Sequence, residues 1–393
     1  MVVKAEAVCT KISCNLAVHL RRRKIVDVVF IFNGALYRMV EGFLFSERWD
    51  GARGIGDYPF SIYIYISVSQ SLELAITGLV LRIESKHFYV YDDLDNKIRI
   101  CSLRGKFKKD FALKRDKLSV TDLVVVGDKV RYTIIDEKSG VIEDVFPRRN
   151  FLSRKATRMR GSTHRGERLE QIIAANLDCL FIVTSVDQPN FNNKTLDRFL
   201  VTAESAHIQP AIILNKMDLD LDDIMGEWIE LYREIGYDVF PVSAIEQEGF
   251  EEIADYARNK KSIVWGHSGV GKSSVLNALY PSLLLKTGDI SYATNKGTHT
   301  TVTVTLYMPE PDTFLIDTPG IREIEPYGIR KEDLAHYFKE FVPYLNECRF
   351  STCTHEHEPG CGVLAAAEAG HISGERFDSY LRMLQTIEDD INF

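Results

Sequence analysis

The sequence predicts a multidomain protein in which a small antiparallel β-barrel precedes a mostly parallel α/β sheet and a small helical domain. Over residues 170–325, short apolar strands alternate with helical stretches, which is the pattern of a parallel sheet covered by helices on both faces. Residues 74–149 contain five short strand-like runs separated by turns, which suits a barrel of the oligonucleotide-binding type. Three cysteines gather with histidines within residues 348–361 and indicate a metal site in the helical domain.

The bulk composition is that of a globular protein in a reducing compartment, so we expect a cytoplasmic location. Apolar residues make up 45% of the 393-residue chain and charged residues 26%. No apolar run is long enough to span a bilayer, and the stretch after Arg21–Lys24 lacks a small-residue cleavage site, so we predict neither membrane attachment nor a signal peptide. The odd number of cysteines, 7, argues against a disulfide framework.

One strongly basic segment stands out in this acidic chain, whose net charge is −8. Residues 104–168 carry 18 Lys and Arg against 9 Asp and Glu, whereas the rest carries 30 against 47. Such asymmetry predicts a localised contact with a polyanion. The arginine-rich part at 150–169 is predicted to be a basic linker that orders on RNA, with a merely solvating tether as the alternative.

Residues 1–73 form an N-terminal extension without a recognisable motif. They contain β-like apolar runs at 28–32 and 62–67, with a glycine-containing patch between them. These runs fit either a small accessory element or a passive extension with no separate task, and we favour the passive extension.

The predicted barrel offers candidate contacts for RNA. Its five expected strands are residues 76–83, 88–91, 97–103, 129–135 and 141–146. Phe88, Tyr89, Tyr91 and Phe107 are candidate platforms for stacking bases, and the lysines after Arg104 could follow a phosphate backbone. Each of these residues taken singly is better explained as barrel core or solvated surface, whereas the patch as a whole favours RNA.

A phosphate-binding loop is the clearest motif of the α/β segment. The strand at 263–265 leads into Gly-x-x-x-x-Gly-Lys-Ser and then into a helix-forming stretch, which is the context this loop requires. The glycines let backbone N–H groups point at phosphate oxygens, Lys272 neutralises the β- and γ-phosphates, and the Ser273 hydroxyl can ligate Mg²⁺. The predicted phosphate contacts are Gly266, His267, Ser268, Gly269, Val270, Gly271, Lys272, Ser273 and Ser274.

A second motif selects guanine. Asn215, Lys216, Met217 and Asp218 follow the apolar strand at 211–214. The Asp218 carboxylate can accept from guanine N1–H and N2–H₂ together, whereas adenine lacks both donors in that arrangement. Ser243 and Ala244 follow the next strand, at 239–242, where their loop can support the base. GTP and GDP are therefore the expected ligands.

A third motif and a threonine-rich stretch complete the predicted active site. Asp317 and Gly320 of Asp-Thr-Pro-Gly follow the strand at 314–316 and can meet a Mg²⁺-bound water and the γ-phosphate. Residues 297–301 stand where the first switch belongs, and a threonine there would complete the Mg²⁺ shell. We prefer Thr300 and keep Thr301 open, although this stretch also reads as the entry to a strand at 302–306.

The cysteine cluster has the composition of a structural zinc site. Cys348, Cys353 and Cys361 with one imidazole can close a tetrahedral Zn²⁺ shell, one per chain, without an open position. Both His355 and His357 lie within reach. Helices expected at about 331–342 and 375–389 would pack around the site.

The order of the motifs carries a family resemblance. The guanine reader, which is the motif at 215–218, precedes the phosphate loop, and Asp-Thr-Pro-Gly follows that loop. The order of motifs in an ordinary GTPase is therefore circularly permuted. In this order and wording, residues 74–390 resemble the small ribosomal subunit biogenesis GTPase family. The resemblance selects His355 as the fourth zinc ligand. Together with the strand, helix and charge patterns, it divides the chain into five expected segments: the extension (1–73), an oligonucleotide-binding barrel (74–149), the linker (150–169), a permuted GTPase domain (170–325) and a zinc-binding helical domain (326–393).

The resemblance also implies a function. We expect a monomeric GTP hydrolase that binds the 30S subunit through its rRNA, is stimulated by it, assists its late maturation and is released after hydrolysis. Ile321 stands where many GTPases have a water-orienting glutamine, and the resemblance implies His299 in that role. Thr298, at a position often basic in the family, and the extra N-terminal residues depart from its pattern. Two alternatives are a GTPase that regulates a protein partner through a zinc adaptor, and an RNA-binding module whose nucleotide site only tunes affinity.

Overall fold

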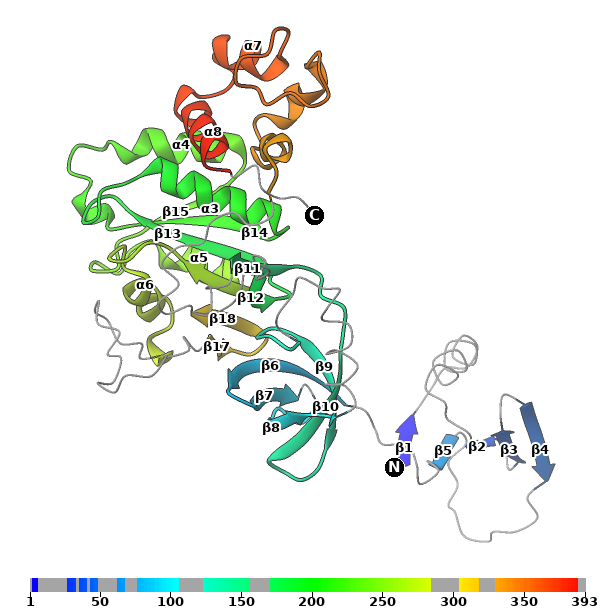
Figure 1. Ribbon diagram of the computed structural model, residues 1–393. Helices are drawn as coiled ribbons and strands as arrows, with labels where there is room; N and C mark the ends of the chain where they lie inside the picture. Colours follow the sequence, from blue (N-terminus) through cyan, green and yellow to red (C-terminus); the bar gives the residue numbers. More distant parts are fainter. Residues whose placement is uncertain are drawn as a thin grey trace, which may run out of the picture. The chain divides into compact units, whose positions relative to one another are not determined.

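The chain divides into two compact units, Met1–Ala75 and Ile76–Phe393 (Figure 1). The structure is a computed structural model that describes residues 2–5, 27–32, 35–40, 43–48, 62–67, 76–92, 94–105, 123–155, 170–283, 304–317 and 329–387. Among these residues, no helix is both long enough and apolar enough to cross a membrane.

The N-terminal unit contains a sheet of its own. Its five strands pair antiparallel in the order β1-β5-β2-β3-β4. The strands are β1 (Val2–Ala5), β2 (Asp27–Phe32), β3 (Ala35–Val40), β4 (Phe43–Arg48) and β5 (Ile62–Ser67). The two apolar runs expected to be β-like are thus β2 and β5, while the passive role of the extension stays a prediction.

The second unit begins with the predicted barrel. Its strands are β6 (Ile76–Glu84), β7 (His87–Asp92), β8 (Ile98–Leu103), β9 (Lys129–Ile134) and β10 (Ser139–Val145). They pair in the order β6-β7-β8-β10-β9, and β9 closes the ring by pairing with β6. β8 and β10 run parallel, whereas the other pairs are antiparallel. This closed ring of five strands confirms the oligonucleotide-binding type of barrel.

Alternating side chains fill the barrel. Val130 and Tyr132 of β9 are fully buried, whereas the alternate residues Lys129 and Arg131 are exposed. Phe88 is only 8% exposed and belongs to this core, so it cannot serve as the stacking platform that the sequence allowed. Gly78 is required by close packing, because a Cβ there would lie 2.5 Å from a methyl carbon of Val90.

The α/β domain has parallel strands in the order β15-β14-β13-β16-β18, and β17 adds antiparallel to β18. These strands are β13 (Cys179–Ser185), β14 (Gln209–Asn215), β15 (Asp238–Pro241), β16 (Lys261–Trp265), β17 (Thr305–Glu310) and β18 (Thr313–Asp317). β17 begins three residues later than the predicted strand at 302–306, whose first two residues lie outside the described ranges. The parallel sheet is confirmed.

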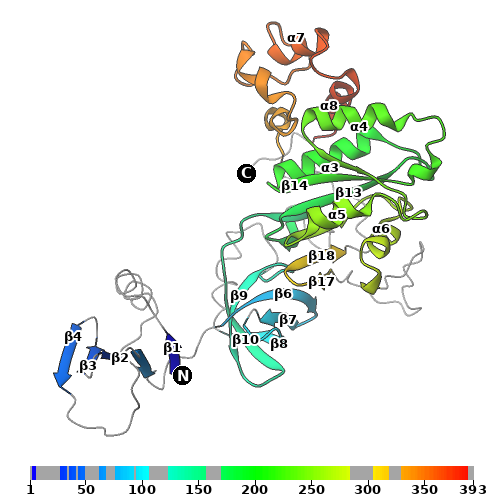
Figure 2. The same ribbon diagram turned by 180° about the vertical axis from the view of Figure 1, so that it is seen from behind.

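Helices cover both faces of this sheet (Figures 1 and 2). One core joins it to α3 (Asn193–Ser205) and α4 (Met225–Ile235), and the other joins it to α5 (Phe250–Ala257) and α6 (Lys272–Leu279). Neighbouring residues of a central strand serve opposite cores, since Ile182 packs in the first and Phe181 in the second. The near-continuous apolar strands follow from burial on both faces.

The junction between the barrel and the α/β domain is more ordered than a linker. β11 (Phe151–Lys155) pairs antiparallel with β12 (Glu170–Ala175), so the first part of the predicted linker is a strand. The Asn150 amide donates to the carbonyls of Leu177 and His207 at 2.8 and 3.0 Å. Residues 156–169, with most of the remaining arginines, lie outside the described ranges.

The C-terminal module, defined here as residues 329–387, consists of short helices around an aromatic core. Its elements are η3 (Lys331–Tyr337), η4 (Val342–Glu347), α7 (Gly362–Glu368) and α8 (Gly374–Thr386). The helix expected at 331–342 is wrong: η3, a short 3₁₀ helix, covers its first part, and a second 3₁₀ helix, η4, begins only at its last residue. Pro343 lies in the first turn of η4 and has no backbone N–H, so a helix that began before it could not continue through it with regular hydrogen bonds. Phe338, Phe341 and Tyr380 fill the centre.

A buried ion pair fastens this module to the α/β domain. The Arg376 guanidinium of α8 pairs with Asp197 of α3, and both side chains are fully buried. Arg376 Nε also donates to Glu340 at 2.6 Å, and the Tyr232 hydroxyl donates to Asp197 at 2.7 Å. Burial raises the pKa of Asp197, and the Arg376 charge opposes that rise. Removing one partner would therefore leave an uncompensated charge in the interface.

We expect Arg376→Met to destabilise the full chain by about 3 kcal/mol, the range for breaking a buried ion pair from one side. The control is Arg382→Ala on the same helix, whose pair with Asp378 is exposed and should contribute little to stability. Urea unfolding followed by tryptophan fluorescence measures both, because Trp228 stacks near Tyr232 at this interface. Equal losses in the two variants would contradict this role for Arg376.

Candidate active site and metal centre

The phosphate-binding loop joins the end of β16 to the beginning of α6. A Cβ on Gly266 would lie 2.1 Å from the carbonyl oxygen of Val183, so only glycine fits there. Gly271 has a φ of +93°, and a Cβ there would lie 2.3 Å from Asn215 Nδ2. His267, Ser268 and Gly269 between them are exposed, whereas Val270 is buried and anchors the loop. Backbone N–H groups of the exposed segment and the α6 N-terminus can meet an anion.

Lys272 begins α6 and turns back over the same loop. Its Nζ donates to the carbonyl oxygens of Gly266 and His267 at 2.9 and 2.8 Å. These bonds hold the ammonium at the mouth of the loop, where it can neutralise phosphate charge. Ser273 and Ser274 follow in the first turn of α6 and are half-buried.

The guanine reader and the phosphate loop are tied together by Asn215. This residue ends β14 and is only 1% exposed. Its Nδ2 donates to the Val270 carbonyl at 2.9 Å, while its Oδ1 accepts from the Ala244 N–H at 3.2 Å. One buried amide thus fixes the spacing between the loop for phosphate, the loop after β14 and the loop after β15.

We expect Asn215→Ala to weaken GTP and GDP binding alike, by about 10- to 100-fold. The variant removes two buried hydrogen bonds and leaves their partners unsatisfied, at about 1–3 kcal/mol each. Calorimetric titration with each nucleotide measures this loss. A variant that lost affinity for GTP alone would show that Asn215 acts on the γ-phosphate rather than on the shared frame.

The remaining residues predicted to read guanine form a compact turn. Lys216 adopts a left-handed conformation, with a φ of +66°, and Met217 and Asp218 continue in a short 3₁₀ turn. The Ser243 hydroxyl donates to Asp218 Oδ1 at 2.7 Å, so the loop after β15 orients the carboxylate. Asp218 is half-buried, which places its carboxylate at the surface of the turn.

The loop after β13 also borders this site, and the sequence analysis missed it. The Lys216 ammonium donates to the carbonyl oxygen of Gln188. The Ser185 hydroxyl donates to the Pro189 carbonyl at 2.7 Å, and Pro189 packs 3.3 Å from where a Cβ of Gly269 would stand. The signal was an Asp-x-Pro-Asn turn at a strand's carboxyl end, where ligands of such sheets bind.

The hydrolytic side of the site lies mostly outside the described residues. Asp317 ends β18, and its backbone pairs with Val264 of β16, so it stands beside the strand that carries the phosphate loop. The positions of His299, Thr300 and Gly320 are not described. Their assigned roles therefore stay predictions.

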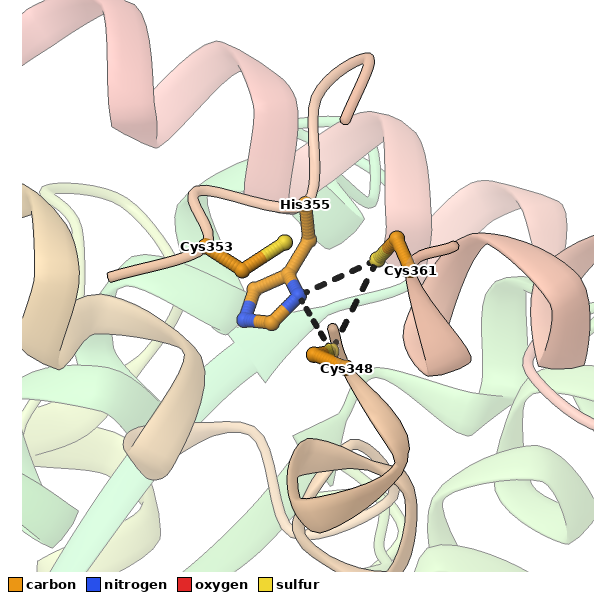
Figure 3. Close-up of side chains that lie close together, drawn as sticks. All are labelled: Cys348, Cys353, His355 and Cys361. Carbon is orange, nitrogen blue, oxygen red and sulfur yellow. Dashed lines mark hydrogen bonds between the residues drawn. The ribbon is translucent and has the colours of Figure 1, made fainter. Parts of the chain in front are cut away.

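Four side chains of the C-terminal module converge on one point (Figure 3). The ligand atoms of Cys348, Cys353, His355 and Cys361 all lie within 4.8 Å of one another. His355 Nδ1 lies 3.5 and 3.3 Å from the sulfurs of Cys348 and Cys361, which are 3.9 Å apart. Sulfurs of a tetrahedral zinc site with Zn–S bonds of about 2.3 Å are about 3.8 Å apart, so this set fits such an ion. His357 lies on the surface beside Glu356.

Local hydrogen bonds shape this cluster. Gly360, with a φ of +75°, accepts from the Arg349 N–H at 3.0 Å and turns the chain back toward Cys361. The Glu358 carboxylate accepts from the Thr354 N–H at 2.7 Å and holds the ligand loop. Burial raises the pKa of Cys353 to about 12, and a bound divalent cation would favour its thiolate.

Comparison with known proteins identifies the family. The model of the RsgA GTPase matches residues 145–326. Small ribosomal subunit biogenesis GTPase RsgA of Chlorobaculum tepidum is 37% identical over 318 residues, which are 80% of this chain and 99% of that protein. The chain belongs to the RsgA GTPase family. Its RsgA relative from Chlorobaculum parvum is 41% identical over 68% of this chain and 87% of that protein.

The structural comparison agrees. YjeQ from Thermotoga maritima superposes with a TM-score of 0.63 at 34% identity, covering 79% of this chain and 98% of that one. Because the predicted guanine-reading residues 215–218, at and after the end of β14, precede the phosphate loop after β16, the chain is a circularly permuted member of the GTP-hydrolysing enzymes. As an RsgA-family GTPase it hydrolyses GTP, a reaction for which GTPases use Mg²⁺, and its cysteine–histidine cluster can hold a metal ion.

Proposed function

We propose that this RsgA-family GTPase binds the 30S ribosomal subunit through its rRNA, assists late maturation, and is released when GTP is hydrolysed. Its relatives are named small ribosomal subunit biogenesis GTPases, so the chain is a ribosome-assembly GTPase. The observation that carries the finer proposal is that a guanine-nucleotide site and an oligonucleotide-binding barrel share one continuous sheet. A nucleotide change on one side can therefore alter an RNA contact on the other.

The residue roles in this proposal follow the chemistry of the site. Asp218 reads the guanine, Lys272 neutralises the phosphates, and Ser273 with Asp317 would hold Mg²⁺. Thr300, with Thr301 as the alternative, would complete the Mg²⁺ shell in the GTP state and let go after hydrolysis. His299 would place the attacking water, since Ile321 has no group that can do so. Slow intrinsic turnover follows if the switches become ordered on the 30S subunit.

Further parts of the proposal concern the metal and the cellular setting. The metal is one structural Zn²⁺ held by Cys348, Cys353, His355 and Cys361, because three thiolates and an imidazole leave no open position. The protein acts as a monomer in the cytoplasm, where ribosomal subunits are assembled and thiols stay reduced. The domain limits given from the sequence are also part of the proposal, with the difference that residues 151–155 of the predicted linker form strand β11.

GTP turnover with and without purified 30S subunits tests this function. We expect the 30S subunit to raise the turnover number at least about ten-fold, whereas 50S subunits should leave it unchanged. Lys272→Ala should remove the stimulated rate and thereby exclude a contaminating hydrolase. A rate insensitive to 30S subunits would contradict the proposal and favour a protein partner engaged through the C-terminal module.

A further inference from the structure

Strand β17 belongs at once to the α/β sheet and to the barrel. Its first residue, Thr305, pairs with Asp317 of β18 on one side and with Arg82 of β6 on the other. These residues form a row of partners on neighbouring strands. The row continues into the barrel, where Arg82 pairs with Tyr89 and Tyr89 pairs with Ile100. Figures 1 and 2 show these strands side by side in both views. One row of paired residues therefore connects the predicted Mg²⁺ site with the outer face of the barrel.

Side-chain packing makes this connection stiff. Leu306 of β17 is 3% exposed and shares a core with Leu81 of β6 and Phe314 of β18. The ring of Tyr91, on β7, meets Phe314 edge-on with centroids 6.5 Å apart. Because close-packed interiors do not deform locally, a shift at the beginning of β17 must also move β6. β17 begins at Thr305, shortly after the stretch at 297–301 in which the first switch is predicted.

The barrel end of the row presents a cation on an aromatic ring. The Arg82 guanidinium carbon lies 4.0 Å from the centroid of Tyr89, and the Tyr89 hydroxyl donates to Glu84 at 2.8 Å. The Arg82 side chain, which also pairs with Glu84 at 3.3 Å, is 38% exposed, and Ile100 is 42% exposed, so both reach the surface of the barrel. Guanidinium planes and aromatic rings are the groups on which unpaired RNA bases stack. The strongly basic segment 104–168 overlaps the same barrel and favours RNA over an acidic partner.

We propose that Arg82, Tyr89 and Ile100 form a stacking platform for an unpaired RNA base, and that β17 makes its affinity depend on the bound nucleotide. This rests on the proposed function, because it names the RNA contact that senses GTP. The coupling is reciprocal. If the protein binds RNA more tightly with GTP than with GDP by some factor, then bound RNA increases the preference of the protein for GTP over GDP by the same factor. Both the nucleotide site and the RNA platform act on the position of strand β17.

Binding of full-length variants to purified 30S subunits, with GDP and with a non-hydrolysable GTP analogue, tests this. We expect Arg82→Gln to weaken binding in the GTP-analogue state by roughly ten-fold, the size of one lost base stack. Binding with GDP should change much less, so the ratio of the two affinities falls. Tyr89→Ala should act in the same way, whereas Tyr89→Trp, which keeps a stacking ring, should bind nearly as well as the wild type.

Arg131→Ala is the matched control. Arg131 lies on the outer face of the same barrel, outside the row, and forms an exposed ion pair with Asp144 that the substitution removes. It should weaken both nucleotide states equally through the lost charge. If Arg82→Gln behaves like Arg131→Ala, the coupling is wrong, and if Tyr89→Trp fails as badly as Tyr89→Ala, the partner is a shaped protein pocket. A wild type without any nucleotide preference would instead refute the proposed function.

Discussion

Asp218→Asn is expected to convert the protein from a guanine to a xanthine nucleotide binder. The substitution replaces a carboxylate that accepts two guanine donors by an amide that can accept only one and must donate with its other end. One charge-assisted hydrogen bond is lost, the other becomes a weaker neutral one, and two donors face each other, so GTP affinity falls by about a thousand-fold. Xanthine carries an oxygen at the position of the guanine amino group, and the introduced side-chain amide can donate to it. Calorimetric titration with GTP, XTP and ATP measures the switch.

Asp222→Asn provides the control for that experiment. Asp222 lies in the same acidic stretch but is exposed, so its substitution removes the same charge without touching the base. Its nucleotide preference should match that of the wild type. The hydroxyl of Ser243 that orients Asp218 remains able to donate to an amide oxygen, so Asp218→Asn keeps its local geometry. An unchanged preference for GTP in Asp218→Asn would refute the assignment of the guanine reader.

Cys361→Ala is expected to release the metal and unfold the C-terminal module. Cys361 supplies one of four ligands and also accepts from the Leu364 N–H at 3.3 Å, where it caps α7. A structural zinc site contributes about 10–16 kcal/mol to folding, far more than a module of this size can lose. Metal analysis should fall from one equivalent of zinc to about none, and circular dichroism should lose helical signal.

His357→Ala separates the two histidines that the sequence left as rivals. Its side chain is 79% exposed and its ring lies beside Glu356, outside the convergent cluster. This variant should retain a full equivalent of zinc and an unchanged unfolding curve, whereas His355→Ala should behave like Cys361→Ala. Loss of zinc from His357→Ala with retention in His355→Ala would reverse the assignment.

The elements of regular structure could be predicted from the sequence because local patterns determine them. The strong alternation of strands and helices identified the parallel sheet, and the spacing of motifs identified the permuted order. The ligand cluster was equally local, since Cys348 and Cys361 lie within one short stretch. Phe88 was less clear, because an aromatic residue on a strand fits a core and a ligand platform equally well until the register is known.

The long-range features could not be read from sequence. Asn215 was recognised as part of a motif, but its bonds to Val270 and Ala244 depend on how three loops meet. The pairing of Thr305 with Arg82 joins residues far apart in the chain and carries no local pattern. The burial of Arg376 is similar, since a charged residue on a helix is ordinarily solvated.

Equilibrium binding to 30S subunits in two nucleotide states tests the central claim most directly. The wild-type protein should bind 30S subunits at least about ten-fold more tightly with a non-hydrolysable GTP analogue than with GDP, as expected for two coupled sites on one protein. Equal affinities in the two states would contradict the claim that GTP hydrolysis times release from the small ribosomal subunit.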